Sequence, residues 1–215
     1  MSRTTRIDLE PLLGALADTS DDPTTERILD ATLETLFALG LKRCTVEEIS
    51  ERANLGRSTI YRRFEGRDDL IHAVVARELR RLLSTITKSV DHLDGVTDKL
   101  VEGFIAGLES VEKSGFLQFV RSEPDLLVFL GDGSTDAISL VTSVMVTQLL
   151  VSTSSEEVDL VKARHVAELV FRLAVSFVSL PVSTLPLDDP DAARAALYAL
   201  FDPLVEATLC KAPAP

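Results

Sequence analysis

Apolar residues recur at helical spacing in the first part of the chain. Ile28, Thr32 and Leu36 follow one another at intervals of four residues, which places them on one face of a helix. Asp22 stands before a proline, an order that suits the first turn of a helix, and Gly40 suits its end. The pattern therefore predicts a helix between Asp22 and Gly40.

The next segment has the pattern of two short helices joined by a tight turn. Thr45 and Glu48 have the spacing of a capping box, in which each side chain accepts a hydrogen bond from the backbone N–H of the other residue. The helix that begins there is predicted to end near Ala53, before a turn over residues 54–56. A third short helix is predicted over residues 57–64.

Helical patterns continue toward the C-terminus. Asp68 and Asp69 suit the start of a fourth helix, which is predicted to reach about Ser89, because negative charge is favourable at a helix N-terminus. Residues 141–151 are rich in β-branched side chains and would also fit a strand, but their length and flanks favour a buried helix. Further helices are predicted over residues 96–112, 116–130, 134–153, 156–179 and 190–210. The predicted fold class is all-α.

These helices divide the chain into three parts. Residues 1–22 form an N-terminal extension, which we expect to be a mobile tail, as chain termini often are. Residues 23–68 form a three-helix domain with a helix-turn-helix, and residues 69–215 form a larger helical domain.

Charge is distributed unevenly along the sequence. The net charge of the 215 residues is −12, which by itself is unfavourable for binding a nucleic acid. Residues 55–67, however, contain four arginines and one glutamate, so this short segment has a net charge of +3. A local basic cluster on a helix-turn-helix is typical of a DNA-binding surface.

Composition narrows the classes of protein that remain. The sequence is 46% hydrophobic and 26% charged, and no apolar run reaches the ~20 residues that cross a bilayer. The cysteines, Cys44 and Cys210, lie far apart, and the three histidines have no metal-ligand spacing. We therefore expect a cytoplasmic protein that is not an enzyme, with no cofactor, no metal site and no membrane partner.

The third helix of the pattern has the side chains that a DNA-reading helix needs. Its outer face must offer hydrogen-bond donors to a major groove ~12 Å wide. The opposite face presents Ile60 and Phe64, which at i and i+4 would pack on the preceding helices. Thr45 offers a hydroxyl and backbone amides to a phosphate, although it could act only as a helix cap. The donors on the outer face are Arg57, Ser58, Thr59, Tyr61 and Arg62.

The segment Arg27–Leu70 resembles the TetR family of regulators. The family's most recognisable run has a small residue, Thr, an aliphatic residue, Tyr, two variable residues and Phe, with a Lys two to four residues later. Arg67 stands at the usual Lys position, Gly56 where Ser is frequent, and Arg63 where His or Tyr is common. In this chain the run is Ser58-Thr59-Ile60-Tyr61-Arg62-Arg63-Phe64.

This resemblance implies a role for each residue of the run. Tyr61 and Thr59 would hold phosphates, although Tyr61 could instead pack in the interior, and Arg67 would clamp the DNA backbone. Contacts to base edges would come from Arg57, Ser58 and Arg62, with arginine to guanine as the favoured pairing. The expected DNA-binding residues are Thr45, Arg57, Ser58, Thr59, Tyr61, Arg62, Arg63 and Arg67.

The resemblance also implies a homodimer with an internal effector pocket. A single unit recognises too few bases for specificity, so two units would bind a palindromic operator. The expected dimer residues, which could otherwise be buried within one subunit, are Leu169, Leu173, Leu197, Leu200 and Leu204. The expected pocket residues, each of which could instead belong to the core, are Phe104, Leu108, Phe116, Phe119, Arg121, Met145, Leu149 and Phe171.

The function that follows is DNA-binding transcriptional regulation. We expect a repressor that a small, mostly apolar ligand releases from its operator, because a ligand that favours a non-binding conformation must weaken DNA binding by the same factor. The alternative is a helical protein that binds a small molecule and no longer binds DNA, which the net charge of −12 favours slightly.

Overall fold

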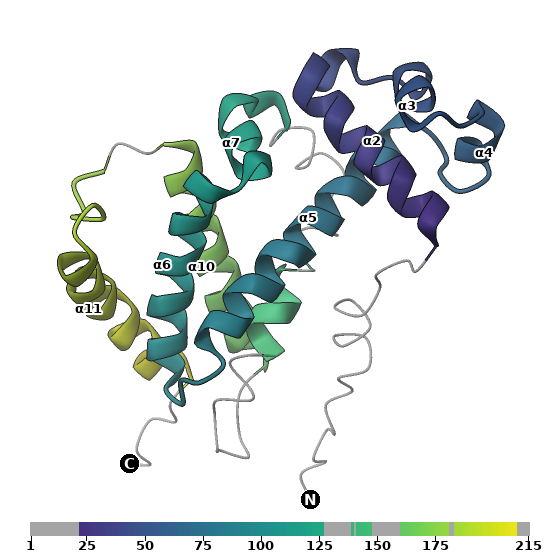
Figure 1. The fold of residues 1–215 in the computed structure, drawn as a ribbon. Helices are drawn as coiled ribbons and strands as arrows, with labels where there is room; N and C mark the ends of the chain where they lie inside the picture. Colours follow the sequence, from purple (N-terminus) through teal and green to yellow (C-terminus); the bar gives the residue numbers. More distant parts are fainter. Residues whose placement is uncertain (1–21, 127–138, 140, 148–159, 181–182, 210–215) are drawn as a thin grey trace, which may run out of the picture.

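The chain is described here by a computed structural model. It describes residues 22–126, 139, 141–147, 160–180 and 183–209, and the regular structure of these residues is helical (Figure 1). The elements are α2 (Pro23–Leu39), the 3-10 turn η1 (Leu41–Arg43), α3 (Val46–Ala53), α4 (Arg57–Tyr61), α5 (Arg67–Val90), α6 (Val96–Lys113), α7 (Gly115–Ser122), α10 (Leu160–Ser179) and α11 (Pro190–Leu209). The all-α fold class is therefore confirmed. The expected tail, apart from Asp22, and residues 134–138, 140 and 148–153 of the predicted helix 134–153 lie outside the described residues.

The ends of the first helices form as their capping residues predict. The Asp22 carboxylate accepts a hydrogen bond from the Thr24 N–H at 3.1 Å, and α2 ends at Gly40, whose φ of 74° is a conformation that glycine adopts readily. The Thr45 hydroxyl accepts a bond from the Glu48 N–H at 3.3 Å and caps α3. Local chemistry thus determines where both helices begin.

Two helices are shorter than predicted. α4 ends at Tyr61 rather than near Phe64, and Phe64 turns into the core. α7 ends at Ser122, so the helix predicted over residues 116–130 is interrupted at Glu123; residues 124–126 are helical again, and residues 127–130 lie outside the described residues. The physical reason is Pro124, because a proline disfavours helical geometry in the residue before it, and Glu123 has φ −124° and ψ 75°. Residues 141–147 are helical, so the helix, not the strand, is the correct interpretation there.

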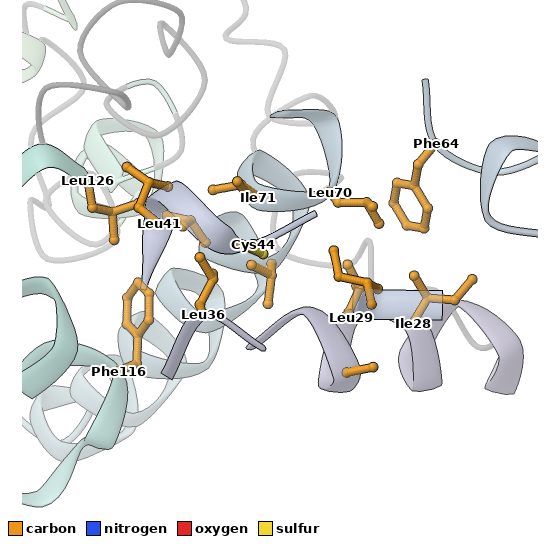
Figure 2. Packing of buried hydrophobic residues seen from close by; sticks show 14 of the residues in the cluster. Ile28, Leu29, Leu36, Leu41, Cys44, Phe64, Leu70, Ile71, Phe116 and Leu126 are labelled. Atoms are coloured by element: carbon orange, nitrogen blue, oxygen red, sulfur yellow. The ribbon is translucent and has the colours of Figure 1, made fainter. Parts of the chain in front are cut away.

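The three N-terminal helices and the start of α5 share one hydrophobic core. Ile28, Ile49, Ile60 and Leu70 are completely buried in it. Phe116 of α7 belongs to the same core, and Figure 2 shows its ring close to Leu36 and Leu41. The N-terminal domain is therefore packed directly against an element of the C-terminal domain.

α5 connects the two domains. It packs against α2 at its start and continues into the C-terminal helices, where it packs against α6 (Figure 1). Its Arg77, with only 6% of the side chain exposed, forms ion pairs with Glu26 at 3.1 Å and with Asp30 at 2.8 Å, both on α2. This buried guanidinium holds α5 against the first helix of the N-terminal domain.

The C-terminal helices form a second core. α6 packs between α5 and α11, and α10 contacts both α6 and α11. Polar pairs hold α11 on α6: Arg194 donates to Glu102 at 2.6 Å, and the Tyr198 hydroxyl donates to Asp98 at 2.6 Å. Within the described residues, none of the helices has the length and apolar character needed to cross a membrane.

Candidate nucleic-acid interface and internal cavity

The turn between α3 and α4 is fixed by its own hydrogen bonds. Asn54 has the left-handed φ of 50°, which ends α3, and the Leu55 N–H donates to the Ser50 carbonyl at 3.1 Å. The Ser50 hydroxyl donates to the Leu55 carbonyl at 2.6 Å. Ile60, completely buried, holds α4 on the core. The outer face of α4 is consequently presented at a defined angle at the edge of the molecule (Figure 1).

The outer face of α4 and the residue after it form an exposed polar surface. Arg57, Ser58, Tyr61 and Arg62 are exposed, whereas Thr59 is half-buried. Tyr61 exposes 54% of its surface, so it does not pack in the protein interior. Hydroxyl and guanidinium donors are thus gathered on one short helix whose other side is anchored.

The four arginines of the basic segment have different surroundings. The Arg57 guanidinium pairs with Glu47 of α3 at 2.7 Å, and both side chains are exposed. Arg67 donates to the carbonyls of Leu41 and Cys44 at 2.6 and 2.7 Å. Within the described part of the chain, the Arg62 guanidinium has no hydrogen-bond or ion-pair partner. Arg62 is therefore the arginine with the greatest freedom to bind an external anion.

Arg63 takes part in the helix cap of α2. Its guanidinium donates to the Asp22 carboxylate at 2.8 Å, and this bond, followed by those from the Thr25 hydroxyl and the Thr24 N–H, lowers the pKa of Asp22 to about 2. The sequence pattern missed this role, and the role of Arg67 at η1, because both depend on partners more than twenty positions away. The charge of Arg63 is largely offset by Asp22, so its contribution to a basic surface is smaller than expected.

A cavity of about 580 Å³ lies in the C-terminal domain. α5, α6, α7, residues 141–145 and α10 form its walls. Five residues expected to line a pocket do so: Phe104, Leu108, Phe116, Met145 and Phe171. Its size is that of a cavity for a drug-sized molecule.

Two residues expected in the pocket lie elsewhere, and a third is outside the described residues. Phe119 packs its ring against Phe37 of α2, with ring centroids 5.4 Å apart, because this side of α7 faces the N-terminal domain. Arg121 is exposed on α7 and does not line the cavity. Leu149 is the residue outside the described ranges.

The expected dimer residues separate into exposed and buried ones. Leu169 of α10 is 55% exposed and Leu200 of α11 is 49% exposed. Leu173 and Leu204 are partly buried against the second core. Leu197 is completely buried in that core, so it packs within its own protomer and is removed from the expected dimer surface.

The buried lysine of the cavity was not singled out from the sequence. Lys99 of α6 lines the cavity and is 8% exposed. The sequence did contain a signal for this role, because Lys99 lies on the same helix face as Leu100 and Phe104. Gly103 and Gly107 follow on that face, one and two helical turns later. Among the described residues, no cluster of three or more His, Cys, Asp or Glu side chains has the arrangement of a metal site.

Comparison with known proteins agrees with the helix-turn-helix geometry. The family described as "Bacterial regulatory proteins, tetR family" matches residues 28–74, the segment from α2 into α5. The HTH-type transcriptional regulator YvkB of Bacillus subtilis is 38% identical over 55 residues, which cover 26% of this chain and 29% of that protein. The chain thus matches about a third or less of that relative's length.

Other similarities extend over most of the chain. The HTH-type transcriptional regulator AlkX of Mycobacterium tuberculosis is 27% identical over 191 residues, which cover 84% of each protein. The crystal structure of the TetR family repressor AlkX from Dietzia sp. covers 87% of this chain and 97% of its own, with a TM-score of 0.62 and 23% identity. The arrangement of the N- and C-terminal helices is therefore one that solved structures share.

Proposed function

We propose that this chain, a member of the TetR family of bacterial regulatory proteins, binds a palindromic operator as a homodimer and is released from it by a small, mostly apolar ligand. The observation that carries the proposal is the exposed face of α4, where Arg57, Ser58 and Tyr61 lie beside the guanidinium of Arg62, which no described residue engages. A helix with this chemistry fits a major groove, where arginine binds guanine and hydroxyls bind phosphates.

The roles on DNA follow from the surroundings of each side chain. Arg62 and Ser58 would contact base edges, and Tyr61, Thr59 and Thr45 would hold phosphates. Arg57 would exchange its exposed pair with Glu47 for a contact to DNA, since an exposed ion pair contributes about 0–1 kcal/mol. Arg63 and Arg67 would act mainly by fixing the ends of α2 and η1, because their guanidinium groups are bound to the protein.

The cavity has a physical connection to the DNA-binding helices. One end of it is lined by Val75, Phe116, Leu117 and Val120, and these residues belong to the core that also contains Leu36 of α2. A ligand that displaces α7 would therefore disturb the packing under the helix-turn-helix. If the ligand binds the displaced arrangement more tightly, it must weaken DNA binding. DNA must then weaken ligand binding by the same factor.

The lining of the cavity supports an apolar ligand. Of the 26 residues that line it, nearly all have aliphatic or aromatic side chains or are glycines. The relative from Dietzia is a repressor implicated in the biodegradation of n-alkanes, which are themselves apolar. Burial of apolar surface would supply most of the binding energy at about 25 cal/mol per Å².

A homodimer is supported by two exposed leucines on neighbouring helices. Leu169 and Leu200 lie on α10 and α11, which pack against each other in the protomer. A twofold-symmetric contact through these helices would place two copies of α4 for adjacent half-sites.

Selection of bound sequences from a random duplex library would test the proposal. Purified protein should enrich a palindromic sequence, and the affinity for that duplex should fall steeply with salt concentration, because phosphate contacts release counterions. No enrichment at low salt by folded protein would contradict DNA binding. Enrichment of a single half-site without its symmetric copy would contradict the dimer.

A further inference from the structure

Lys99 is a buried cation in an apolar wall. It lies in the first turns of α6, is 8% exposed, and lines the cavity beside Leu100 and Gly103. The other cation of the lining, Arg172, is different, because 62% of its side chain is exposed and it pairs with Glu168 at 2.8 Å. Lys99 is therefore the positive charge that an occupant of the cavity would meet.

The carboxylates nearest to Lys99 in sequence are used elsewhere. Asp98 accepts a hydrogen bond from Tyr198, and Glu102 accepts from Arg194, both on α11. Among the described residues, no carboxylate lies within ion-pair distance of the Lys99 ammonium group. The Lys99 ammonium group thus has no counterion among the residues that the structure describes.

The position of Lys99 suits a negative charge beside it. Most of the side chain is buried among apolar neighbours, and the ammonium group is not among the fully buried polar atoms without a partner, so it keeps contact with solvent. The first turns of a helix are also its positive end, where a lysine is unfavourable and an anion is favourable. An ammonium group on an apolar cavity wall, with no carboxylate beside it among the described residues, would be complemented by an anionic group of a ligand.

The cavity has a polar end and an apolar end. Its α5 wall extends from Val75 to Val90, and the fifteen helical steps of 1.5 Å between them span about 22 Å. α6 packs against this wall so that Gly103 lies against Ile86 and Val90. Lys99, one turn before Gly103, is therefore near the Val90 end. The opposite end is lined by Phe116 and its neighbours.

We infer that the cavity binds an amphiphile with a long apolar body and one anionic head group, such as the carboxylate of a fatty acid. The head group forms an ion pair with Lys99, and the apolar body extends toward Phe116, next to the core shared with α2. This inference rests on the proposed function and specifies the ligand class of the same cavity. It also explains how the ligand reaches α7: the anchored head group directs the far end of the chain to it.

The test compares an acid with the alcohol of equal chain length. Dodecanoate and 1-dodecanol are titrated into wild-type protein and into Lys99→Met and Lys88→Met variants, and dissociation constants are measured by displacement of a fluorescent probe. Lys88 is the matched control, because it is exposed on α5 near the same end and does not line the cavity. We expect wild type to bind dodecanoate at least tenfold more tightly than 1-dodecanol.

The variants should distinguish the contribution of the ligand's head group to the affinity from that of its apolar chain. Lys99→Met should lose this preference with its affinity for 1-dodecanol unchanged, and Lys88→Met should retain it. Equal binding of acid and alcohol by wild type, or no binding of either, would overturn the inference without any reliance on the variants. A preference for the acid that Lys99→Met retains would overturn the assignment to Lys99.

A second readout distinguishes this inference from the proposed function. The effect of dodecanoate on the complex with the selected duplex is measured with the same proteins. If dodecanoate binds through Lys99 and the duplex stays bound, the ligand site stands and the release mechanism fails. If 1-dodecanol releases the duplex as well as dodecanoate does, the release mechanism stands and the anionic head group is not required.

Discussion

Arg62 and Arg63 are neighbours in the chain with opposite surroundings. The Arg63 guanidinium is bound to Asp22 at 2.8 Å, and its side chain is 22% exposed. Arg62 lies on the outer side, beyond the last turn of α4, and no described residue engages its guanidinium. The Arg62 guanidinium can bind a phosphate or a guanine directly. The Arg63 guanidinium would first have to break its bond to the Asp22 carboxylate, so it would gain less binding free energy. The two adjacent residues should therefore respond differently to substitution.

We expect Arg62→Glu to weaken binding to the selected duplex at least 100-fold, because it replaces attraction by repulsion at the DNA surface. Stability should change by less than about 0.5 kcal/mol, since the side chain is exposed. Electrophoretic mobility shift and thermal unfolding measure the two effects. Arg121→Glu, the same change on α7, is the control and should leave DNA affinity unaltered. Retained affinity in Arg62→Glu would show that α4 is not the recognition helix.

At the scale of elements, long-range polar contacts hold short helices in place. Asp22 caps α2 and also binds Arg63, so the start of the first helix is tied to the end of α4. Arg77 of α5 reaches back to Glu26 and Asp30 of α2. These contacts are physically separate from the hydrophobic core, and they fix the angle at which α4 is presented. Helix orientation should consequently depend on the protonation of Asp22.

Stability should fall with pH as Asp22 is protonated. Its folded pKa is about 2, below the ordinary value of 3.8, so the unfolded chain takes up the proton first. The stabilising contribution is fully present above pH 3.8 and is lost as the pH falls toward 2. Asp22→Asn keeps a good helix cap and removes the charge. We expect this variant to be less stable than wild type at pH 5 and the difference to narrow at pH 3.

Urea unfolding at the two pH values measures this effect. Asp91→Asn, at an exposed position after α5, is the control for the loss of one carboxylate, and its difference from wild type should not change between pH 5 and pH 3. A difference for Asp22→Asn that stays constant with pH would contradict the assigned ion pair.

At the scale of the whole molecule, the cavity, α7 and the N-terminal core form one continuous packed body. Phe116 lines the cavity and also belongs to the core that contains Leu36 of α2, where Figure 2 shows it among the buried residues of that core. Packed protein interiors deform little. A ligand that enlarges the cavity must therefore move α7 and the N-terminal helices packed against it. In a dimer, a small rotation of each N-terminal domain would change the distance between the two copies of α4.

The dimer itself should depend on exposed apolar residues of α10 and α11. Leu169→Asp combined with Leu200→Asp places two charges in the proposed interface, and we expect the sedimentation mass to fall from twice 23.4 kDa to 23.4 kDa. The matched control, Leu169→Met with Leu200→Met, keeps an apolar surface and should remain dimeric. A double aspartate variant that stays dimeric would exclude this surface.

Local features of the sequence determined the all-α class and most helix ends. Asp22, Gly40 and Thr45 act on backbone groups within four residues, so their effects are visible without the fold. The helix-turn-helix and the outward position of Tyr61 follow from the same short-range spacing. Pro124 is a local signal of the same kind, and it accounts for the break at Glu123 in the helix that was predicted over residues 116–130.

Only the tertiary structure decided which charges are free and which apolar residues face outward. Arg63 finds its partner 41 positions away and Arg77 finds Glu26 51 positions away, and no local pattern specifies such distances. Leu197 and Leu200 are both leucines of α11, yet packing against α6 and α10 buries one and leaves the other exposed. The same packing encloses Lys99 in an apolar cavity. Sequence spacing fixes the face of a helix, but the elements that cover that face are set by the whole fold.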